Sequence, residues 1–456
     1  MRKFLPAGFV LALGFPLVAV ADTASDINAL RQEIESIRGA YEQRLQALEQ
    51  RLRAAEARAP APAADPFATN APAATGAVQA ARAGGGANAF NPAISLILSG
   101  TYGRSTRDPA DYSVTGFALP AGSEAGPAGR GFSLSESELS LKANIDPFLR
   151  GEAHIALQPD NSVSVEEAFV QTTGIGNGLS LKAGRFFSGV GYLNQQHAHV
   201  WDFADAPLAY QVFLGTQFAD DGLQLRWLAP TDLFLEAGAE IGRGRSYPGS
   251  DTARNGAGAS ALFVHTGGDI GASHSWRAGL SILNAKVRDQ SLVTSGAFGG
   301  SSAGSFNGRS RVWIGDFVYK WAPNGNATRT NFKLQGEYLR STRRGDLVAD
   351  AADPGDSGHR TSQSGWYLQS VYQFMPRWRV GARTERLDSG RVNDADLMES
   401  SVYKPRKNSL MLEFNPSEFS RLRLQLARDR SRFGLNDNQL LLQYQMSLGA
   451  HGAHGF

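Results

Sequence analysis

The stretch that decides the fold class is NQLLLQYQMSLGA, residues 438–450. Its apolar side chains return at every second position, and polar or small residues fill most of the positions between them. Because successive side chains of a β-strand point to opposite sides, this period of two indicates a strand with one apolar and one polar face. The apolar face consists of Leu440, Leu442, Tyr444, Met446, Leu448 and Ala450.

The same period of two continues through the chain from Ala93 onward, in sixteen such stretches. Short turns such as Asp146-Pro147 and Met375-Pro376 mostly alternate with long links between these stretches. The long links are 104–131, 188–221, 244–257, 287–308, 342–363 and 388–407. The predicted strands are 93–103, 132–145, 148–158, 162–173, 179–187, 222–229, 232–243, 258–269, 274–286, 309–322, 329–341, 364–374, 377–387, 408–415, 419–431 and 438–450.

An even number of strands, with short turns at one end and long links at the other, is the pattern of a bacterial outer-membrane barrel. We therefore predict an all-β, transmembrane antiparallel β-barrel. Its outer surface would contact outer-membrane lipid, and its chain ends would lie in the periplasm. Alternation of lipid-facing and lumen-facing residues explains a mean hydropathy of only −0.27. A secreted soluble β protein is the alternative interpretation.

Aromatic residues at particular positions support the barrel. The chain ends in Phe456, and Tyr444 and Met446 precede it on the same parity. An aromatic end after alternating apolar residues is typical of the signal that the barrel-assembly machinery binds. Four tryptophans lie within a few residues of a predicted short turn, where an interfacial aromatic girdle is expected. They are Trp227, Trp276, Trp321 and Trp378.

The composition excludes several classes of protein. The chain has 456 residues, no cysteine, 45 basic and 43 acidic residues, and a formal charge of +2. The absence of cysteine excludes a disulfide scaffold, a thiol nucleophile and a cysteine-type zinc site. Arg2 and Lys3 account for the excess charge, so the chain without its first segment is formally neutral. Because a nucleic-acid-binding protein is expected to be basic, no nucleic-acid partner is predicted.

The segments before the barrel indicate export and oligomerisation. Residues 1–21 have the layout of a secretory signal peptide that ends in Ala19-Val20-Ala21. Residues 22–58 are predicted to form a periplasmic α-helical coiled coil, and 59–91 an Ala/Pro/Gly linker before the barrel at 92–456. Isoleucine in the seam favours a homotrimer, and a lone amphipathic helix is the alternative. The seam consists of Ile27, Leu30, Ile34, Ile37, Tyr41, Leu45, Leu48 and Leu52.

Three segments resemble the phosphate-selective porin O/P superfamily: Glu166-Glu-Ala-Phe-Val170, Leu181-Lys-Ala-Gly-Arg-Phe-Phe187 and Gly191-Tyr-Leu-Asn194. This resemblance implies a sixteen-stranded trimeric porin, in some members with a periplasmic coiled coil.

Further segments, among them Gln196-His-Ala-His-Val-Trp-Asp-Phe-Ala-Asp-Ala-Pro-Leu208, are similar to a proteobacterial group. Its members are often labelled zinc-regulated TonB-dependent outer-membrane receptors. Such receptors contain a folded plug domain, whereas here only a helix and a linker precede the predicted barrel. The other segments of this resemblance are 90–98 and 449–456.

Charged residues recur on the face of several strands that is predicted to line a water-filled lumen. Rows of arginine create a positive field that favours anions, so a mild anion preference is one expectation. The alternative is an Arg–Glu network that braces the barrel wall. The pore-lining candidates are Arg226, Lys333, Glu337, Arg377, Arg379, Arg383, Glu385, Glu413, Arg421 and Arg423.

The sequence thus predicts a porin-like channel for passive diffusion of small hydrophilic solutes or ions. The link 188–221, expected to fold inward as a constriction, contains a His-x-His pair with nearby carboxylates, which is a zinc-type donor set. A receptor or binding protein linked to zinc uptake is therefore an alternative, and a structural envelope protein acting through its coiled coil is another. No catalytic site is predicted, because no histidine has an evident nucleophile partner, and zinc is the one cofactor considered. The candidate metal ligands are His197, His199, Asp202 and Asp205.

Overall fold

The fold is described from a computed structural model, which covers residues 92–120, 125–251, 255–295, 301–348, 358–393 and 402–449. These residues belong to the second of two compact units, residues 84–456. The predicted signal peptide, the coiled coil with its seam, the linker and Phe456 lie outside the described residues.

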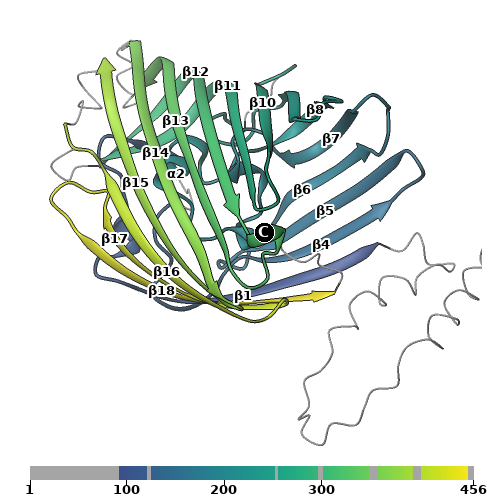
Figure 1. The fold of residues 1–456 in the computed structure, drawn as a ribbon. Coiled ribbons are helices and arrows are strands. Elements are labelled where there is room, and N and C mark those ends of the chain that lie inside the picture. The colour runs from purple at the N-terminus through teal and green to yellow at the C-terminus, as the bar shows by residue number, and fades with distance from the viewer. Residues whose placement is uncertain are drawn as a thin grey trace, which may run out of the picture. The chain divides into compact units, whose positions relative to one another are not determined.

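The described strands form one closed antiparallel sheet (Figure 1). Strand β1 pairs with β18 on one side, with Leu96 opposite Leu448, and with β4 on the other, with Leu96 opposite Leu139. Sixteen wall strands therefore form a ring without a free edge, as the sequence predicts. They are β1 (Ala93–Ser105), β4 (Ser137–Asn144), β5 (Leu149–Leu157), β6 (Val163–Thr172), β7 (Leu179–Phe187), β8 (Ala219–Leu228), β9 (Phe234–Gly242), β10 (Ala259–Ile270), β11 (His274–Ser295), β12 (Ser301–Trp321), β13 (Asn331–Val348), β14 (Gly358–Met375), β15 (Trp378–Asn393), β16 (Arg406–Ser417), β17 (Ser420–Arg430) and β18 (Asp437–Gly449).

Two short strands supplement this ring. Strand β3 (Gly131–Leu134) pairs with β1 just beyond β4, and β2 (Ala118–Pro120) pairs with β11 beyond the end of β10. The short turns lie at one end of the barrel, which we call the short-turn end. Both ends of the barrel's chain are also there, because Ala93 lies opposite Lys142 near the β4–β5 turn and Ser95 lies opposite Gly449.

The prediction was wrong about the extent of three long links. The ladder between β11 and β12 continues as far as Ser295 opposite Ser301, well into the predicted link 287–308. Strands β13 to β15 extend in the same way into 342–363 and 388–407. These extensions are rich in Ser, Thr, Gly and Arg. Four of their few apolar residues, Val287, Leu292, Phe306 and Leu347, belong to one buried cluster but are too widely spaced in the sequence to show a period of two. The extensions therefore read as loops, although the backbone hydrogen bonds of the ladder continue.

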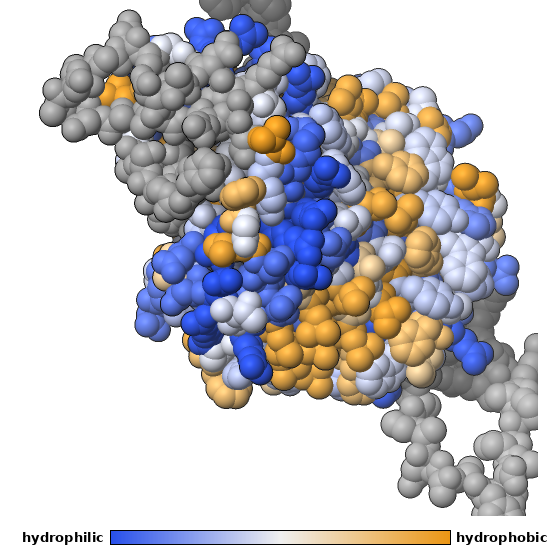
Figure 2. Space-filling view, turned by 90° about the vertical axis from the view of Figure 1, so that its left-hand side faces the viewer, coloured by the Kyte–Doolittle hydropathy of each residue, from blue (hydrophilic) through white to orange (hydrophobic). Residues whose placement is uncertain are grey.

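The outward side chains form an apolar band around the wall. Leu410 on β16 has 62% of its surface exposed and Leu262 on β10 has 58%. Figure 2 shows apolar side chains gathered into a continuous area on one face of the barrel, with hydrophilic side chains beside it. Further exposed members are Leu223, Leu225, Val264, Leu280, Phe317, Leu368, Val380, Leu412, Leu426, Leu442, Tyr444 and Leu448.

The helices of the described residues are short. They are the 3₁₀ turns η1 (Pro109–Asp111), η2 (Leu193–Gln195), η3 (Ala198–Val200) and η4 (Pro323–Gly325), and the helix α2 (Leu208–Leu214). Among the described residues, none of these helices has the length and apolarity that a membrane-spanning helix needs.

Candidate functional site

The link between β7 and β8 folds into the barrel, and we call residues 188–218 the inserted loop. It contains η2, η3 and α2, and all seven residues of α2 are buried. Helix α2 follows Pro207, and it ends at Gly215, whose φ of +62° is the left-handed conformation that glycine adopts most readily. In Figure 1, α2 lies inside the ring of strands, behind β14 and β15.

One side of the barrel interior is apolar rather than water-filled. The side chains of Ile314, Leu339 and Leu387 are fully buried and belong to the same cluster as Leu208 and Phe213 of α2. A fully buried side chain of this size stabilises the fold by about 1.5–3 kcal/mol. The expected polar, water-filled lumen is therefore wrong for this side, because the inserted loop supplies apolar partners that strand alternation alone does not reveal.

Glu337 on β13 holds the beginning of the inserted loop. Its carboxylate accepts hydrogen bonds from the backbone N–H groups of Tyr192 and Leu193, at 3.2 and 2.9 Å. It also accepts bonds from the hydroxyls of Tyr210 and Tyr367, at 2.8 and 2.6 Å. Four donors on one buried carboxylate fix the loop backbone against β13 and β14.

Asp202 holds the middle of the loop against basic residues of the wall. Its carboxylate lies 3.0 Å from Lys333 Nζ and 2.6 Å from Arg379 Nη2. Burial alone would raise the pKa of Asp202, but the charges of Lys333 and Arg379 outweigh it and hold the pKa below its ordinary value. Asp202 is therefore a charged anchor for the loop.

Asp205 makes a second anchor three residues further on. Its carboxylate lies 2.7 Å from Arg383 Nη2 and 2.6 Å from Lys407 Nζ. Gln425 donates a further hydrogen bond to it at 2.7 Å. Burial opposes ionisation here too, but Arg383 and Lys407 keep the pKa of Asp205 below its usual range. Two residues after Arg383, on the same inward face of β15, Glu385 accepts a hydrogen bond from the Leu208 backbone N–H, at 2.6 Å.

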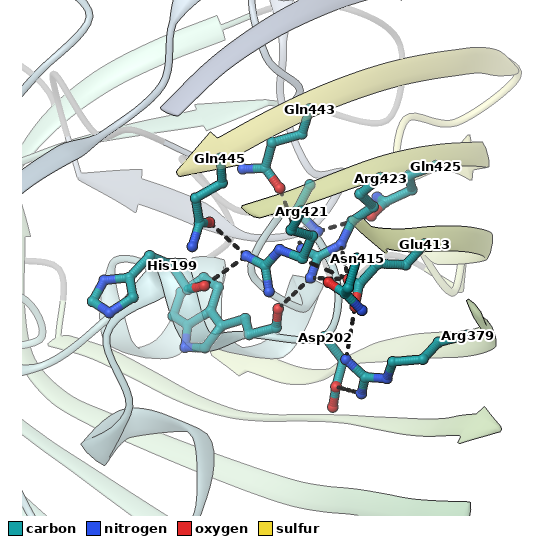
Figure 3. Close-up of polar contacts among 12 residues, drawn as sticks. His199, Asp202, Arg379, Glu413, Asn415, Arg421, Arg423, Gln425, Gln443 and Gln445 are labelled. Atoms are coloured by element: carbon teal, nitrogen blue, oxygen red, sulfur yellow. Dashed lines mark hydrogen bonds and ion pairs between the residues drawn. The ribbon is translucent and has the colours of Figure 1, made fainter. Parts of the chain in front are cut away.

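The arginines of β17 bind the loop backbone instead of facing an open pore (Figure 3). Arg421 donates to the carbonyl of His199 at 2.6 Å, and Arg423 donates to the carbonyl of Trp201 at 2.8 Å. Glu413 on β16 balances their charge, with a distance of 2.7 Å to Arg423 Nη2. The arginine rows are therefore part of an anchoring network that joins wall to loop. Removing one partner of such a buried pair typically costs about 3–5 kcal/mol.

Arg226 lies on the inner face as predicted, with its Nη2 atom 3.4 Å from Gln195 of the inserted loop, whereas Arg377 does not. Arg226 on β8 bonds Gln224 at 2.7 Å and lies over the ring of Phe263. Arg377 is exposed in the β14–β15 turn with a φ of +72°, so it is not on the inner wall as predicted. The strand alternation on which that prediction rests begins only at Trp378.

The predicted metal ligands fall into two groups. Asp202 and Asp205 bind the wall cations and are not beside the histidines, so a single site formed by all four predicted ligands is wrong. His197 and His199 lie instead against β4, β5 and β6. There they meet Glu138, which is 1% exposed, at 3.0 and 3.1 Å respectively.

A cavity of about 550 Å³ remains between the inserted loop and the opposite wall. Strands β1, β6, β7, β17 and β18 contribute to its lining, together with Ser135 and Glu136 just before β4. Its charged lining residues are one base and four acids: Arg104, Glu136, Asp160, Glu166 and Asp205.

Several residues of this interior are not evident from the sequence. Lys407 falls in a predicted link, because the predicted strand begins one residue later, but it lies on the inward parity of β16. In the sequence, Glu138 and His154 are recognisable only as polar residues of alternating strands, and nothing there marks them as partners of the loop histidines. Glu166 and Glu167 both face the loop because β6 has a bulge there, which breaks the period of two.

No family model matches this chain. A protein of Aquifex aeolicus (strain VF5), described only as uncharacterized, is 32% identical over 400 residues, which cover 81% of this chain and 80% of the Aquifex protein. Similar solved structures include the outer-membrane channel DcaP of Acinetobacter baumannii, at 12% identity and a TM-score of 0.46 over 78% of this chain and 97% of that one. Pseudomonas putida OprB gives 13% identity and a TM-score of 0.47 over 79% and 94%. Likenesses this distant carry no conclusion about function.

Proposed function

The chain belongs to the same family as the uncharacterized Aquifex aeolicus protein, and we propose that it is an outer-membrane channel narrowed by its inserted loop. It would pass small hydrophilic solutes or ions by passive diffusion through the cavity beside that loop. The observation that carries the proposal is the combination of a closed barrel, an apolar outer surface and a polar cavity within.

The outer surface supports a membrane location. Leu262, Leu280 and Leu410 each expose more than half of their surface. Soluble monomers rarely expose continuous apolar areas of this kind, because water contact costs about 25 cal/mol for each Å². Lipid removes this cost, and the closed ring satisfies the backbone hydrogen bonds that an open sheet edge would leave unpaired in lipid.

The orientation follows from the charges at the end opposite the short turns. Arg386, Arg406 and Arg430 lie directly beside one another on β15, β16 and β17, on the outward parity of their strands. Like charges placed opposite one another destabilise a sheet in water. Phosphate groups of surrounding lipid would neutralise this row, which fits an end that lies among the headgroups of the outer leaflet.

The ion preference that we propose differs from the sequence-based expectation. The arginines expected to favour anions are paired with Asp202, Asp205, Glu385 and Glu413. Apart from Asp205, which is paired with Arg383 and Lys407, the cavity is lined by three acids, Glu136, Asp160 and Glu166, and one base, Arg104. We therefore propose a weak preference for cations.

The assembly remains part of the proposal. Because the described chain enters the barrel at the short-turn end, a coiled coil before it would lie in the periplasm. The trimer rests on the predicted heptad seam and on the resemblance to trimeric porins. The resemblance to the phosphate-selective porin O/P superfamily likewise remains a prediction, as does the part of the barrel-assembly machinery.

Single-channel conductance in planar bilayers tests this function. The exported full chain, purified and shown to be folded by its heat-dependent migration on a gel, should give discrete open steps. Steps in multiples of three would support the trimer, and the reversal potential in a salt gradient should indicate a weak cation preference. Folded protein that produces no steps would overturn the channel proposal.

A further inference from the structure

We propose that Glu138, His154, His197 and His199 form a binding site for a divalent transition-metal ion, for which zinc is the best fit. The site would join the inserted loop to strands β4 and β5. It does not depend on the proposed channel function, because metal binding requires only the folded barrel.

Three imidazole nitrogens converge on one carboxylate. The Nδ1 atoms of His154, His197 and His199 lie 2.7, 3.0 and 3.1 Å from the two carboxylate oxygens of Glu138. Glu138, His154 and His197 offer ligand atoms that are all within 4.8 Å of one another. The rings are also close, with centroids 4.4 Å apart for His154 and His197 and 5.5 Å apart for His197 and His199.

These separations suit one tetrahedral ion. Zinc binds histidine nitrogen and carboxylate oxygen at about 2.0–2.2 Å, which places the ligand atoms of one tetrahedral site about 3.3 Å apart. Glu138, His154 and His197 give three ligands that already converge. His199, whose Nδ1 atom lies 3.1 Å from Glu138 but outside that converged set, would become the fourth ligand by a turn of its ring. A set of nitrogens with one hard oxygen, without thiolate, favours zinc or a neighbouring divalent transition metal over calcium or magnesium.

A second layer of carboxylates orients the histidines from outside. His197 Nε2 lies 2.9 Å from Glu167, and His154 Nε2 lies 3.5 Å from Glu152. Metal-binding histidines commonly use their second nitrogen in this way, which fixes the ring and leaves the first nitrogen for the metal. Glu167 is itself held by the backbone N–H of Phe187 at 2.9 Å.

The inserted loop presents its two histidines from a fixed backbone. His197 and His199 flank Ala198, the first residue of η3. Arg421 holds the His199 carbonyl at 2.6 Å, and in Figure 3 the His199 ring points away from that contact. The anchoring network of β17 thus holds the backbone on one side and leaves the imidazole for β4 on the other.

The cavity provides a route for the ion. Glu166 and Ala198 line the cavity, and Glu166 Oε2 lies 3.2 Å from His197 Nδ1. His154 and His199 are 4% and 8% exposed, so they lie one layer behind Glu166. An ion would therefore pass from the cavity by way of Glu166 to buried ligands.

A different histidine of the wall supplies the matched control. His265 on β10 is fully buried, and its Nδ1 atom lies 3.1 Å from Glu236. It is therefore a buried histidine paired with a glutamate, as His154 is with Glu138. It forms a single pair on the wall, whereas the proposed site gathers three rings around one carboxylate.

Zinc binding should be measured on the folded full chain in detergent, after removal of metals with a chelator. Calorimetry with zinc chloride should give one ion per chain, and cobalt should give the absorption spectrum of a tetrahedral site. The His197→Ala/His199→Ala variant should lose this binding, and Glu167→Gln should weaken it about 10- to 100-fold. His265→Ala should bind zinc as the wild type does.

Folding is checked on each variant by heat-dependent migration, and Glu138→Gln gives a conservative second test if the double histidine variant does not fold. Wild-type protein that binds no zinc would overturn the proposal. Binding that survives in the double variant or in Glu138→Gln, or that is lost equally in His265→Ala, would overturn it as well. Because no bilayer is used, a failure of conductance would leave this result unaffected.

Discussion

The two sides of the barrel interior are built differently. Along β12 to β17 the wall contacts the inserted loop through an apolar cluster and a dense set of opposite charges. Along β1 and β18 the wall faces the cavity, and β4 to β6 meet the histidines. A loop that binds one wall leaves space beside the other, so the anchoring residues determine where the passage lies.

This difference also changes how the interior charges should be interpreted. On the filled side, Arg379 and Arg383 have carboxylate partners on the inserted loop. These arginines therefore fix the loop to the wall rather than attract ions into the passage. On the open side, Asp160 is an exposed residue of the cavity lining. The selectivity should therefore depend on the open side, and the stability of the constriction on the filled side.

The largest effect is expected from releasing the loop on the filled side. Asp202→Asn together with Asp205→Asn removes the loop carboxylates from Arg379, Arg383 and Lys407. The two arginines then keep only the carboxylates of their wall partners, Glu413 and Glu385. Each broken buried pair should cost about 3–5 kcal/mol of anchoring energy. We expect larger and noisier conductance steps than in the wild type, measured in planar bilayers.

An exposed ion pair provides the control for this double variant. Asp388 pairs with Lys404 at 2.6 Å, with both side chains 44% exposed, so Asp388→Asn should cost at most about 1 kcal/mol. Its conductance should match that of the wild type. If the loop variant and this control conduct alike, the anchors do not determine the width of the passage.

A smaller effect is expected where the loop begins. Gly191 has a φ of +67°, and a Cβ at this position would lie 2.5 Å from Glu337 Oε2 and 2.8 Å from the Tyr210 hydroxyl. Gly191→Ala should therefore destabilise the loop by about 1–3 kcal/mol through backbone strain and displaced hydrogen bonds. Limited proteolysis should cut the loop faster than in the wild type.

Gly256→Ala is the matched control, because Gly256 also has a positive φ but has no atom within 4 Å of its added Cβ. The Gly256→Ala variant should have a similar backbone strain, but it should not disturb the hydrogen bonds around Glu337. Equal proteolysis of the loop in the two variants would contradict the role of Gly191.

How far the sequence predicts this molecule follows from the range of its interactions. The wall depends on local alternation, so all sixteen strands could be placed, and Arg421 and Arg423 could be assigned to the inward face. The partners of these arginines could not be predicted, because the His199 and Trp201 carbonyls lie 222 residues away along the chain. Nothing local in the sequence pairs Asp205 with Lys407, or brings His154 to His197.

The bulge at Glu166 shows the same limit on a smaller scale. A strict period of two places only one of Glu166 and Glu167 inside, whereas the extra residue in β6 turns both toward His197. The metal prediction failed for the aspartates for a related reason. The prediction groups Asp202 and Asp205 with the histidines because they are close in sequence. In the fold, the aspartates contact β13 to β16 and the histidines contact β4 to β6, on the opposite wall.

The pH dependence of the constriction should be weak above strongly acidic pH. The pKa values of Asp202 and Asp205 are held below their ordinary value, so their ionised forms stabilise the folded state. That contribution is complete above the unfolded pKa of about 3.9 and is lost as the pH falls through the lower folded value. Conductance measured from pH 7 down to about pH 4 should stay constant. A transition near pH 5 or 6 would mean that Glu337 and Glu385, which hold the loop from the wall, determine the constriction more than Asp202 and Asp205 do.

The smallest effect concerns the outer surface, and its sign depends on the surroundings. Arg406 lies between Arg386 and Arg430 in the ladder, so Arg406→Ser should raise the free energy of unfolding in neutral detergent by about 0.2–1 kcal/mol. In membranes that contain phosphate-rich lipid the same change should lower the free energy of unfolding, because a phosphate contact is lost.

Arg340 is the control, because it faces Trp313 and Ser364 instead of arginines. Arg340→Ser should therefore give no stabilisation in detergent. Urea unfolding in both media measures the two signs, and the same sign in both would mean that the arginine row does not bind lipid phosphate.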